Sequence, residues 1–455
     1  MNLPTELICY MSVFLDNYSK VQFLSSSTTT YSFRKNVFYD DQVKFDEVKH
    51  FDHIDKFRNI HTTFANMLDT VLHLHFDDSF NQRIEYLPPN LESLTFGRLY
   101  DLPILCKLPV SLKKLQFGIY FDHSVENILP IGLTHLNISG HSQQITASSL
   151  PTSLTHLTLG FHFDQTIDEC IPESVTHLTI ESVYNHPIKF LPPSLTYLVL
   201  GQKFNRSIEN IIPATVTHLQ FGSSFNQPID GHLPKSLKIL GFDGFKLPLT
   251  QTSIPRSVVH LTFSGYDGPI SGCIPDSVTH LTFYHRTSLL ESIPKSVIHL
   301  ELSIDDGPIK NNIPYGVTHL TLHGNRPIYD RIPASVTHLT FGYEFNRLVN
   351  GCIPISVTHL TFGSQFNHKM HDNNLPNLTH LTFGHEYNVS SDGKLPQSIT
   401  HLTFGCGFNK SLSRNVPPNV THLTIPLHLK EEVAASVTHL YVVDDIWKQA
   451  RRIKV

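Results

Sequence analysis

Histidine is the residue type in this sequence with the greatest capacity for chemistry. The chain has 455 residues and 30 histidines, and half of these occupy one position of a recurring Val-Thr-His-Leu pattern. Neutral imidazole binds metals, and its ordinary pKa near 6.5 lets it gain or lose a proton at physiological pH. The fifteen are His73, His135, His156, His177, His218, His260, His280, His299, His319, His338, His359, His380, His401, His422 and His439.

A metal site finds little support in the spacing of these histidines. Tetrahedral zinc needs ligands that converge on one point, whereas this histidine recurs in most units of the chain. No cysteine or carboxylate recurs beside it, and there is no His-Glu-x-x-His motif. The sequence therefore predicts no metal and no other cofactor.

Two other roles remain for the repeated histidine. Imidazoles stacked at the roughly 4.8 Å spacing of paired strands repel one another once charged, so stability that falls as pH drops through about 6.5 is one hypothesis. The structural role is the main interpretation. Histidine beside threonine can hydrogen-bond across neighbouring units while its ring packs on the next ring.

Catalysis is not indicated by any local motif. The chain lacks a phosphate-binding G-x-x-x-x-G-K-[ST], a G-x-S-x-G nucleophile turn and a G-x-G-x-x-G before a helix. We therefore expect a protein that is not an enzyme.

The charge balance and the cysteines restrict the class of protein further. The 34 basic and 39 acidic residues argue against a nucleic-acid partner, because a phosphate-binding face is basic. No apolar run approaches the roughly 18–20 residues of a membrane helix, and the first residues lack the basic start of a secretory signal. Six scattered cysteines without a C-x-x-C pair are typical of a reduced chain, so we expect a cytoplasmic protein.

The repeat that carries the histidine defines the architecture. Its third position recurs every 19–21 residues along most of the chain, with a last interval of 17. A period near 20 is typical of leucine-rich-repeat-like solenoids. The sequence predicts a β-solenoid with one short parallel strand per repeat of about 21 residues and a non-helical return.

Within a repeat, alternation gives the direction of each side chain. Leu219 and Phe221 should point into the core, and His218 and Gln220 should point away from it. A short polar residue eight positions after the histidine should bond to the backbone of its own turn, beside a spine of phenylalanines. The predicted polar row is Asn81, Asp101, Asp122, Asp164, Asn205, Asn226, Asn346, Asn367 and Asn409, and the predicted spine is Phe80, Phe225, Phe345, Phe366 and Phe408.

Four repeats depart from histidine at this position. They carry Ser93, Lys114, Tyr197 and Ile239. A face that repeats the same residues in most units carries little information for choosing a partner, so these four are the candidate partner-binding residues.

The first 45 residues differ from the repeats. Pro4 and Glu6 suit the first turn of a helix, and Leu7, Met11 and Phe14 form one apolar stripe. Two further short helices follow, and so small a helical module needs a partner to cover its stripe.

This segment resembles an F-box. Leu3, Pro4, Glu6 and Leu7 match the L-P-x-E-[IL] opening of that family, and Met11, Phe14 and Leu15 match its first helix. The tryptophan usual near the end of the motif is missing, because the single tryptophan is Trp447. The resemblance implies that these seven matched residues bind a Skp1-type adaptor and, through it, a cullin ubiquitin ligase.

The repeats resemble FNIP repeats, which are named for lettering such as FNQPI at 225–229. That family is known from social amoebae and from giant viruses of amoebae, where an F-box often precedes the array, so a viral chain would act in the host cytoplasm. The resemblance implies a non-catalytic substrate receptor whose repeats bind an unknown protein substrate. The alternative is a repeat scaffold without a ligase role.

The predicted domain organisation has four parts. Residues 1–45 are the all-α F-box-like module, and residues 46–70 are a linker and N-terminal cap. Residues 71–442 are the solenoid. Residues 443–455 are a capping helix, with Ile446, Trp447, Ala450 and Ile453 on one face, and a basic tail.

Overall fold

The computed structural model divides the chain into two compact units, unit 1 up to Gln227 and unit 2 from Pro228. The predicted N-terminal helices, with Leu3, Pro4, Glu6, Leu7, Met11, Phe14 and Leu15, lie outside the described residues. The described residues are 38–40, 42–48, 56–62, 69–181, 183–266, 268–284, 293–303, 313–328, 332–349, 351–370, 375–433, 435–443 and 451–453.

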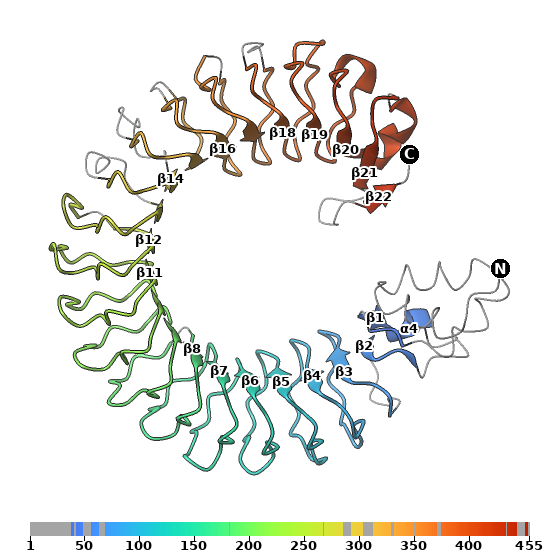
Figure 1. Ribbon diagram of the computed structural model, residues 1–455. Coiled ribbons are helices and arrows are strands. Elements are labelled where there is room, and N and C mark those ends of the chain that lie inside the picture. The colour runs from blue at the N-terminus through green and yellow to red at the C-terminus, as the bar shows by residue number, and fades with distance from the viewer. Residues whose placement is uncertain are drawn as a thin grey trace, which may run out of the picture. The chain divides into compact units, whose positions relative to one another are not determined.

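Unit 1 is a stack of turns, each made of one short strand and a loop that returns to the next strand (Figure 1). Its one described helix is the single turn α4 (Phe45–Val48). Its strands are β1 (Val43–Lys44), β2 (Asn59–Thr62), β3 (His73–Phe76), β4 (Ser93–Thr95), β5 (Lys114–Phe117), β6 (His135–Ile138), β7 (His156–Leu159), β8 (His177–Ile180), β9 (Tyr197–Leu200) and β10 (His218–Phe221).

Unit 2 repeats this plan and adds two 3-10 segments, η4 (Leu412–Arg414) and η5 (Leu427–Glu432). Its strands are β11 (Ile239–Phe242), β12 (His260–Phe263), β13 (His280–Phe283), β14 (His299–Ser303), β15 (His319–His323), β16 (His338–Phe341), β17 (His359–Thr361), β18 (His380–Thr382), β19 (His401–Thr403), β20 (His422–Pro426), β21 (His439–Val443) and β22 (Arg451–Ile453).

The strands of consecutive turns pair in parallel, as the repeat predicts. In unit 1 the repeat positions lie opposite one another, with His218 beside Tyr197 and Leu219 beside Leu198. In unit 2 every strand from β11 to β20 pairs in parallel with the next. One β-strand per repeat and a leucine-rich-repeat-like solenoid are therefore confirmed.

The first turns extend the array towards the N-terminus. Strand β2 pairs in parallel with β3, and β1 pairs with β2. Strand β1 lies at the end of residues 1–45, which we predicted as helical, and β2 lies within residues 46–70, which we predicted as linker and cap. Both contribute to the stack of unit 1.

The C-terminal end differs from the predicted helix. Strand β22 lies antiparallel to β21, with Ile453 opposite Leu440. The helical prediction is wrong at Ile453, because the last residues bond to the open edge of β21. Its other residues, Ile446, Trp447 and Ala450, lie outside the described residues.

Alternation along each strand separates core from surface, as predicted. Leu219 and Phe221 are buried, and His218 and Gln220 are half-exposed on the opposite face. A turn opens each strand, as where the Val216 N–H donates to the Pro213 carbonyl at 3.1 Å. Proline fits there because its own missing N–H is not required by the sheet.

The predicted phenylalanine spine is confirmed. Phe80, Phe225, Phe345, Phe366 and Phe408 are each buried, and aromatic rings stack along each unit. In unit 2 the ring of Phe366 lies between those of Phe345 and Tyr387, at centroid distances of 6.3 and 6.2 Å.

The polar row beside this spine bonds differently from the prediction. The Asn367 side-chain oxygen accepts from the backbone N–H of Asn388 in the next turn, at 2.9 Å. The Asn346 side-chain oxygen accepts from the Asn367 N–H, and that of Asn388 accepts from the Asn409 N–H, both at 3.0 Å. Each amide therefore ties one turn to the next and not to its own backbone. The same row includes Asn185, Asn325 and Asn388 in addition to the predicted members.

In many turns a glycine follows the strand and lets successive turns approach closely. A Cβ on Gly384 would lie 2.1 Å from the carbonyl oxygen of Gly363, and one on Gly222 would lie 2.5 Å from the backbone of Gln202. Any other residue at these positions forces neighbouring turns apart.

No helix within the described ranges is long and apolar enough to cross a membrane.

Candidate protein-interaction surface

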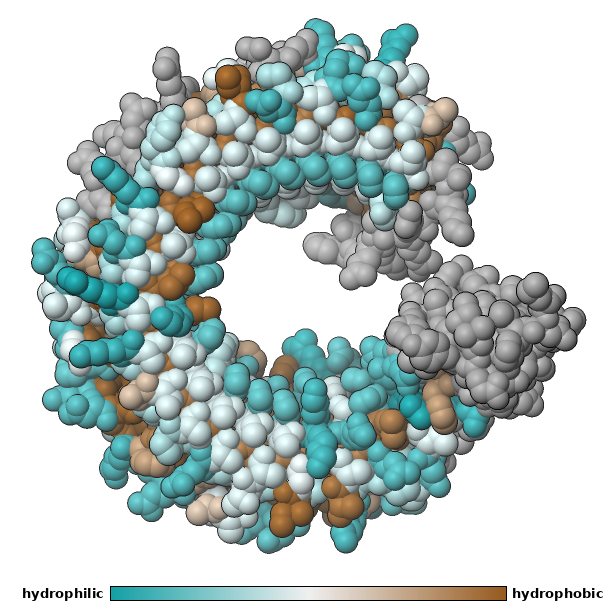
Figure 2. All heavy atoms as spheres, in the orientation of Figure 1, coloured by the Kyte–Doolittle hydropathy of each residue, from teal (hydrophilic) through white to brown (hydrophobic). Residues whose placement is uncertain are grey.

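The exposed face of the strands is the candidate site, because it is the face on which side chains recur in register. The first residue of each strand and the third point away from the core. Figure 2 shows a row of hydrophilic side chains along the strand side of the turns that carry β16–β20. The half-exposed first and third residues of these strands are histidine and threonine.

The histidine rings of neighbouring strands stack face to face. In unit 1, His156 lies 4.0 Å from His135 and 4.1 Å from His177, centroid to centroid. Unit 2 holds a longer column that we name the ten-histidine stack, with centroid distances of 4.0–4.1 Å and interplanar angles of 5–22°. Its members are His260, His280, His299, His319, His338, His359, His380, His401, His422 and His439.

Threonine orients most of these rings. The Thr379 hydroxyl oxygen lies 2.9 Å from His380 Nδ1 and 3.2 Å from the carbonyl oxygen of Thr358. Two oxygens at that distance are stable only with a proton between them, so we infer that the hydroxyl donates to the carbonyl and accepts from Nδ1–H. The neutral Nδ1–H form of the ring is thereby favoured, and its Nε2 keeps a lone pair.

Nine of the stacked histidines resist protonation. Burial, followed by the charges of neighbouring histidines, lowers the pKa of His380 to about 4. Burial and the same kind of neighbours lower the pKa of His156 to about 4. The pKa also lies below its ordinary value, with burial as the main cause, for His135, His177, His280, His319, His338, His359 and His401.

The same stacking opposes metal binding. Lone pairs in parallel rings point in one direction and do not converge on a single ion. Within the described ranges, no group of three or more histidine, cysteine, aspartate or glutamate side chains is arranged to hold a metal. The geometry favours the structural role for the repeated histidine.

The four departures from histidine all lie on this exposed face. Ser93 and Lys114 begin the paired strands β4 and β5 of unit 1, side by side. Tyr197 and Ile239 begin β9 and β11, and each exposes 37% of its surface. The Tyr197 ring lies 5.5 Å from that of His177, which makes it a loosely packed member of the unit 1 column. Their role in partner binding stays a prediction.

A polar cluster on the same face of unit 2 was not predicted. Glu301 Oε1 lies 2.6 Å from His323 Nε2 and accepts a hydrogen bond from the Tyr284 hydroxyl at 2.9 Å. The hydrogen bond to His323 is the main cause that lowers the pKa of Glu301, and burial together with Glu301 raises the pKa of Tyr284 to about 12. The available signal was a glutamate where most repeats carry threonine, in HLELS at 299–303.

A second missed feature is the residue that follows the proline before each strand. This position varies along the chain, and several members are apolar yet open to solvent. Their exposed fractions are 70% for Val110, 82% for Ile131, 76% for Tyr315 and 59% for Ile355. Variable apolar residues after a recurring Leu-Pro or Ile-Pro pair were the signal in the sequence.

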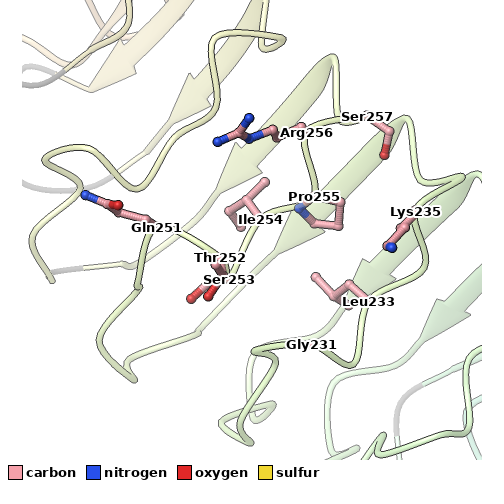
Figure 3. A pocket seen from close by; sticks show the side chains of 10 residues that line it. All are labelled: Gly231, Leu233, Lys235, Gln251, Thr252, Ser253, Ile254, Pro255, Arg256 and Ser257. Carbon is pink, nitrogen blue, oxygen red and sulfur yellow. The ribbon is translucent and has the colours of Figure 1, made fainter.

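One cavity of about 520 Å³ lies in unit 2, between the return loops of two successive turns (Figure 3). Its floor is apolar, with Leu233 and Ile254, and Lys235 and Arg256 stand at its edge from equivalent positions of the two turns. Among the lining residues these two are the charged ones, so the cavity holds no acid–base pair.

This combination of stacked parallel strands, buried leucines and an exposed repeated face defines a leucine-rich-repeat-like solenoid. The chain belongs to the FNIP repeat family. The model of the FNIP repeat matches residues 69–99, 100–141, 141–182, 184–224, 225–266, 266–305, 325–365, 346–386, 366–407 and 387–428.

One solved structure shares the leucine-rich-repeat-like fold of the chain. The chain is similar to CroV588, described as a novel circular LRR protein, with 30% identity, a TM-score of 0.54, and coverage of 90% of this chain and 73% of the other. Among the curated proteins, no sequence matches the chain.

Two more distant structures also share segments with the chain. YopM from Yersinia enterocolitica is 19% identical, with a TM-score of 0.36 over 81% of this chain and 76% of its own. TLR13, solved in a complex with ssRNA13, is 11% identical, with a TM-score of 0.48 over 86% of this chain and 74% of its own. Neither superimposes closely enough to add to the argument.

Proposed function

We propose that this chain is a non-catalytic interaction scaffold whose solenoid binds a protein partner on the exposed strand face. The observation that carries the proposal is that all four departures from the repeated histidine lie on that face, with Tyr197 and Ile239 partly exposed. Tyrosine and an aliphatic side chain in a polar surround are typical anchors of protein interfaces.

The test restores the repeat at the four departures. Ser93→His, Lys114→His, Tyr197→His and Ile239→His together extend the histidine column and remove the side chains that distinguish one turn from another. Partners of the unaltered chain, identified by cross-linking and mass spectrometry, should be lost from this variant. A control with Glu173→Ala and Lys235→Ala, both exposed and outside the strands, should keep them. Equal capture by the fourfold variant would contradict the proposal.

A finer function is proposed from the resemblance of residues 1–45 to an F-box. On this proposal the chain is the substrate receptor of a Skp1–cullin–F-box ubiquitin ligase, and the strand face holds the substrate. Leu3, Pro4 and Leu7 would insert into the adaptor together with Glu6, Met11, Phe14 and Leu15. These seven residues lie outside the described ranges, so the support is the motif itself.

A direct binding assay separates the two functions. Purified Skp1 should bind the full chain and should not bind a Leu3→Ala/Pro4→Ala/Leu7→Ala variant that retains the circular-dichroism spectrum of the solenoid. Absence of Skp1 binding by the unaltered chain would contradict the ligase role and leave the scaffold function in place.

A further inference from the structure

A cysteine and a histidine from successive turns of unit 2 are in direct contact. Cys406 Sγ lies 2.6 Å from His385 Nδ1. Both residues follow the glycine that ends a strand turn, His385 after β18 and Cys406 after β19. Both residues are half-buried, so neither is enclosed in the core.

The backbone holds the two turns so that this contact is fixed. The Gly407 N–H donates to the His385 carbonyl at 3.0 Å, and a Cβ on Gly407 would lie 2.3 Å from that same oxygen. On the other side of the cysteine, a Cβ on Gly405 would lie 2.3 Å from the Gly384 carbonyl oxygen. Glycines flank Cys406 on both sides because the backbones of the two turns lie too close there for a Cβ. This close approach of the two turns places the Cys406 sulfur against the His385 imidazole.

The other described cysteines have different surroundings. Cys352 Sγ donates to the Ile328 carbonyl at 3.0 Å, and Cys273 Sγ donates to the Leu249 carbonyl at 3.3 Å. A carbonyl only accepts, so these contacts retain the thiol proton. Burial raises the pKa of Cys170 to about 11 and raises the pKa of Cys106 and Cys273. Cys406 instead touches a nitrogen that can take its proton.

We propose that Cys406 is a nucleophilic thiol that uses His385 as its base, and that it is the residue through which a hydroperoxide modifies this chain. The thiolate is the reactive form of cysteine, and an imidazole in contact with the sulfur generates it as the reaction proceeds. This inference does not depend on the proposed partner-binding function.

The reaction balances without a further cofactor. His385 Nδ1 takes the thiol proton while the sulfur attacks the terminal oxygen of the hydroperoxide. The S–O bond forms as the O–O bond breaks, and the imidazolium returns the proton to the departing oxygen. The products are the sulfenic acid of Cys406 and an alcohol, or water from hydrogen peroxide. Sulfur loses two electrons and the peroxide gains them.

The experiment measures the rate at which each cysteine of the full chain is modified. Limiting iodoacetamide at pH 7 and peptide mass spectrometry should show Cys406 reacting roughly tenfold or more faster than Cys106 and Cys352, which are also half-exposed. After brief treatment with hydrogen peroxide, dimedone should trap a sulfenic acid at Cys406. Equal alkylation rates, or dimedone adducts on the other two cysteines only, would overturn the proposal.

Two variants show whether the histidine is responsible. His385→Asn should slow alkylation of Cys406 roughly tenfold and leave the rates of Cys106 and Cys352 unchanged. His162→Asn, a change at an exposed histidine of unit 1, should leave all three rates unchanged. Persistence of slow labelling at the buried Cys170 and Cys273 shows that the variants are folded. An unchanged Cys406 rate in a folded His385→Asn protein would refute the base role.

Discussion

The histidine column of unit 2 and that of unit 1 use the same strand position but differ in continuity. Ten histidines stack without interruption from His260 to His439 in unit 2. In unit 1, three histidines stack up to His177. Tyr197 then separates them from His218, with a longer stacked contact of 5.5 Å to His177 and a tilted contact of 5.9 Å to His218. The solenoid therefore does not require histidine at this position. Strand pairing continues through Tyr197 in the same register.

In both units, successive turns approach closely at a glycine. Disrupting this approach should have the largest effect on the free energy of unfolding. Gly384→Val in unit 2 and Gly222→Val in unit 1 should each lower the free energy of unfolding by about 3 kcal/mol, because the new side chain meets the backbone of the preceding turn. Chemical denaturation measures both.

The matched control is Gly351→Ala in unit 2. A Cβ there meets nothing within 4 Å, but the residue has a φ of +72°. Its expected loss is about 1–2 kcal/mol, from backbone conformation alone. If Gly222→Val lowers the free energy of unfolding no more than Gly351→Ala does, the close approach of successive turns matters only where histidines stack.

Acid should produce the next largest effect, and mainly in unit 2. Histidines whose pKa is lowered in the fold bind fewer protons than the unfolded chain, whose histidines titrate near 6.5. Stability is therefore fully present above about pH 6.5 and is lost as the pH falls towards 4. Hydrogen exchange, corrected for its intrinsic pH dependence, should show a larger loss of protection in β16–β19 than in β9 and β10. An equal loss of protection in both regions would mean that an uninterrupted histidine stack does not increase sensitivity to acid.

The threonine beside each histidine gives a smaller and more local difference. Thr379→Val removes two hydrogen bonds, to His380 Nδ1 and to the Thr358 carbonyl, and should lower the free energy of unfolding by about 2 kcal/mol. Thr196→Val removes one bond, to the Thr176 carbonyl, because Tyr197 follows it, and should cost about 1 kcal/mol. Equal losses in denaturation experiments would mean that the threonine–histidine contact adds no stability.

Repairing the interruption should have the smallest effect on stability. Tyr197→His joins His177 to His218 in one column, and the expected change in the free energy of unfolding is within about 0.5 kcal/mol, as for most exposed substitutions. Thermal denaturation measures it, with Tyr343→His, an exposed change outside the strands, as the control. A large stabilisation by Tyr197→His would mean that histidine stacking, and not strand pairing, holds the turns together.

The repeat itself accounts for how much of this structure could be predicted. One period fixes which residues share a face, so the strand at His218–Phe221, the buried Leu219 and the stacked Phe366 all followed from the sequence. The direction of hydrogen bonds did not follow. The Asn367 side-chain oxygen accepts from a backbone N–H that is 21 residues away, in the next turn, and only the fold brings that N–H within reach.

The two sites formed by residues that depart from the repeat were also missed, because their contacts join different turns. Glu301 contacts Tyr284 and His323, which are 17 and 22 residues away, and Cys406 contacts His385 at a distance of 21 residues. The pair of Cys406 and His385 arises because parallel register places position i beside the equivalent position of the next turn. Glu301 lies opposite Thr282 and Thr321 and reaches Tyr284 and His323 two positions further along the neighbouring turns. A search for unusual residues one period apart would have found them.

We conclude that the repeated histidines belong to the scaffold, and that burial, followed by the charges of neighbouring histidines, keeps stacked rings such as His380 neutral. Nitrogen-15 NMR of histidine-labelled protein measures this directly, because it distinguishes the two neutral forms of imidazole and the charged form. We expect stacked rings such as His380 to carry the proton on Nδ1 at pH 7 and to remain neutral at pH 6. Rings protonated on Nε2, or half charged near pH 6.5, would contradict the account.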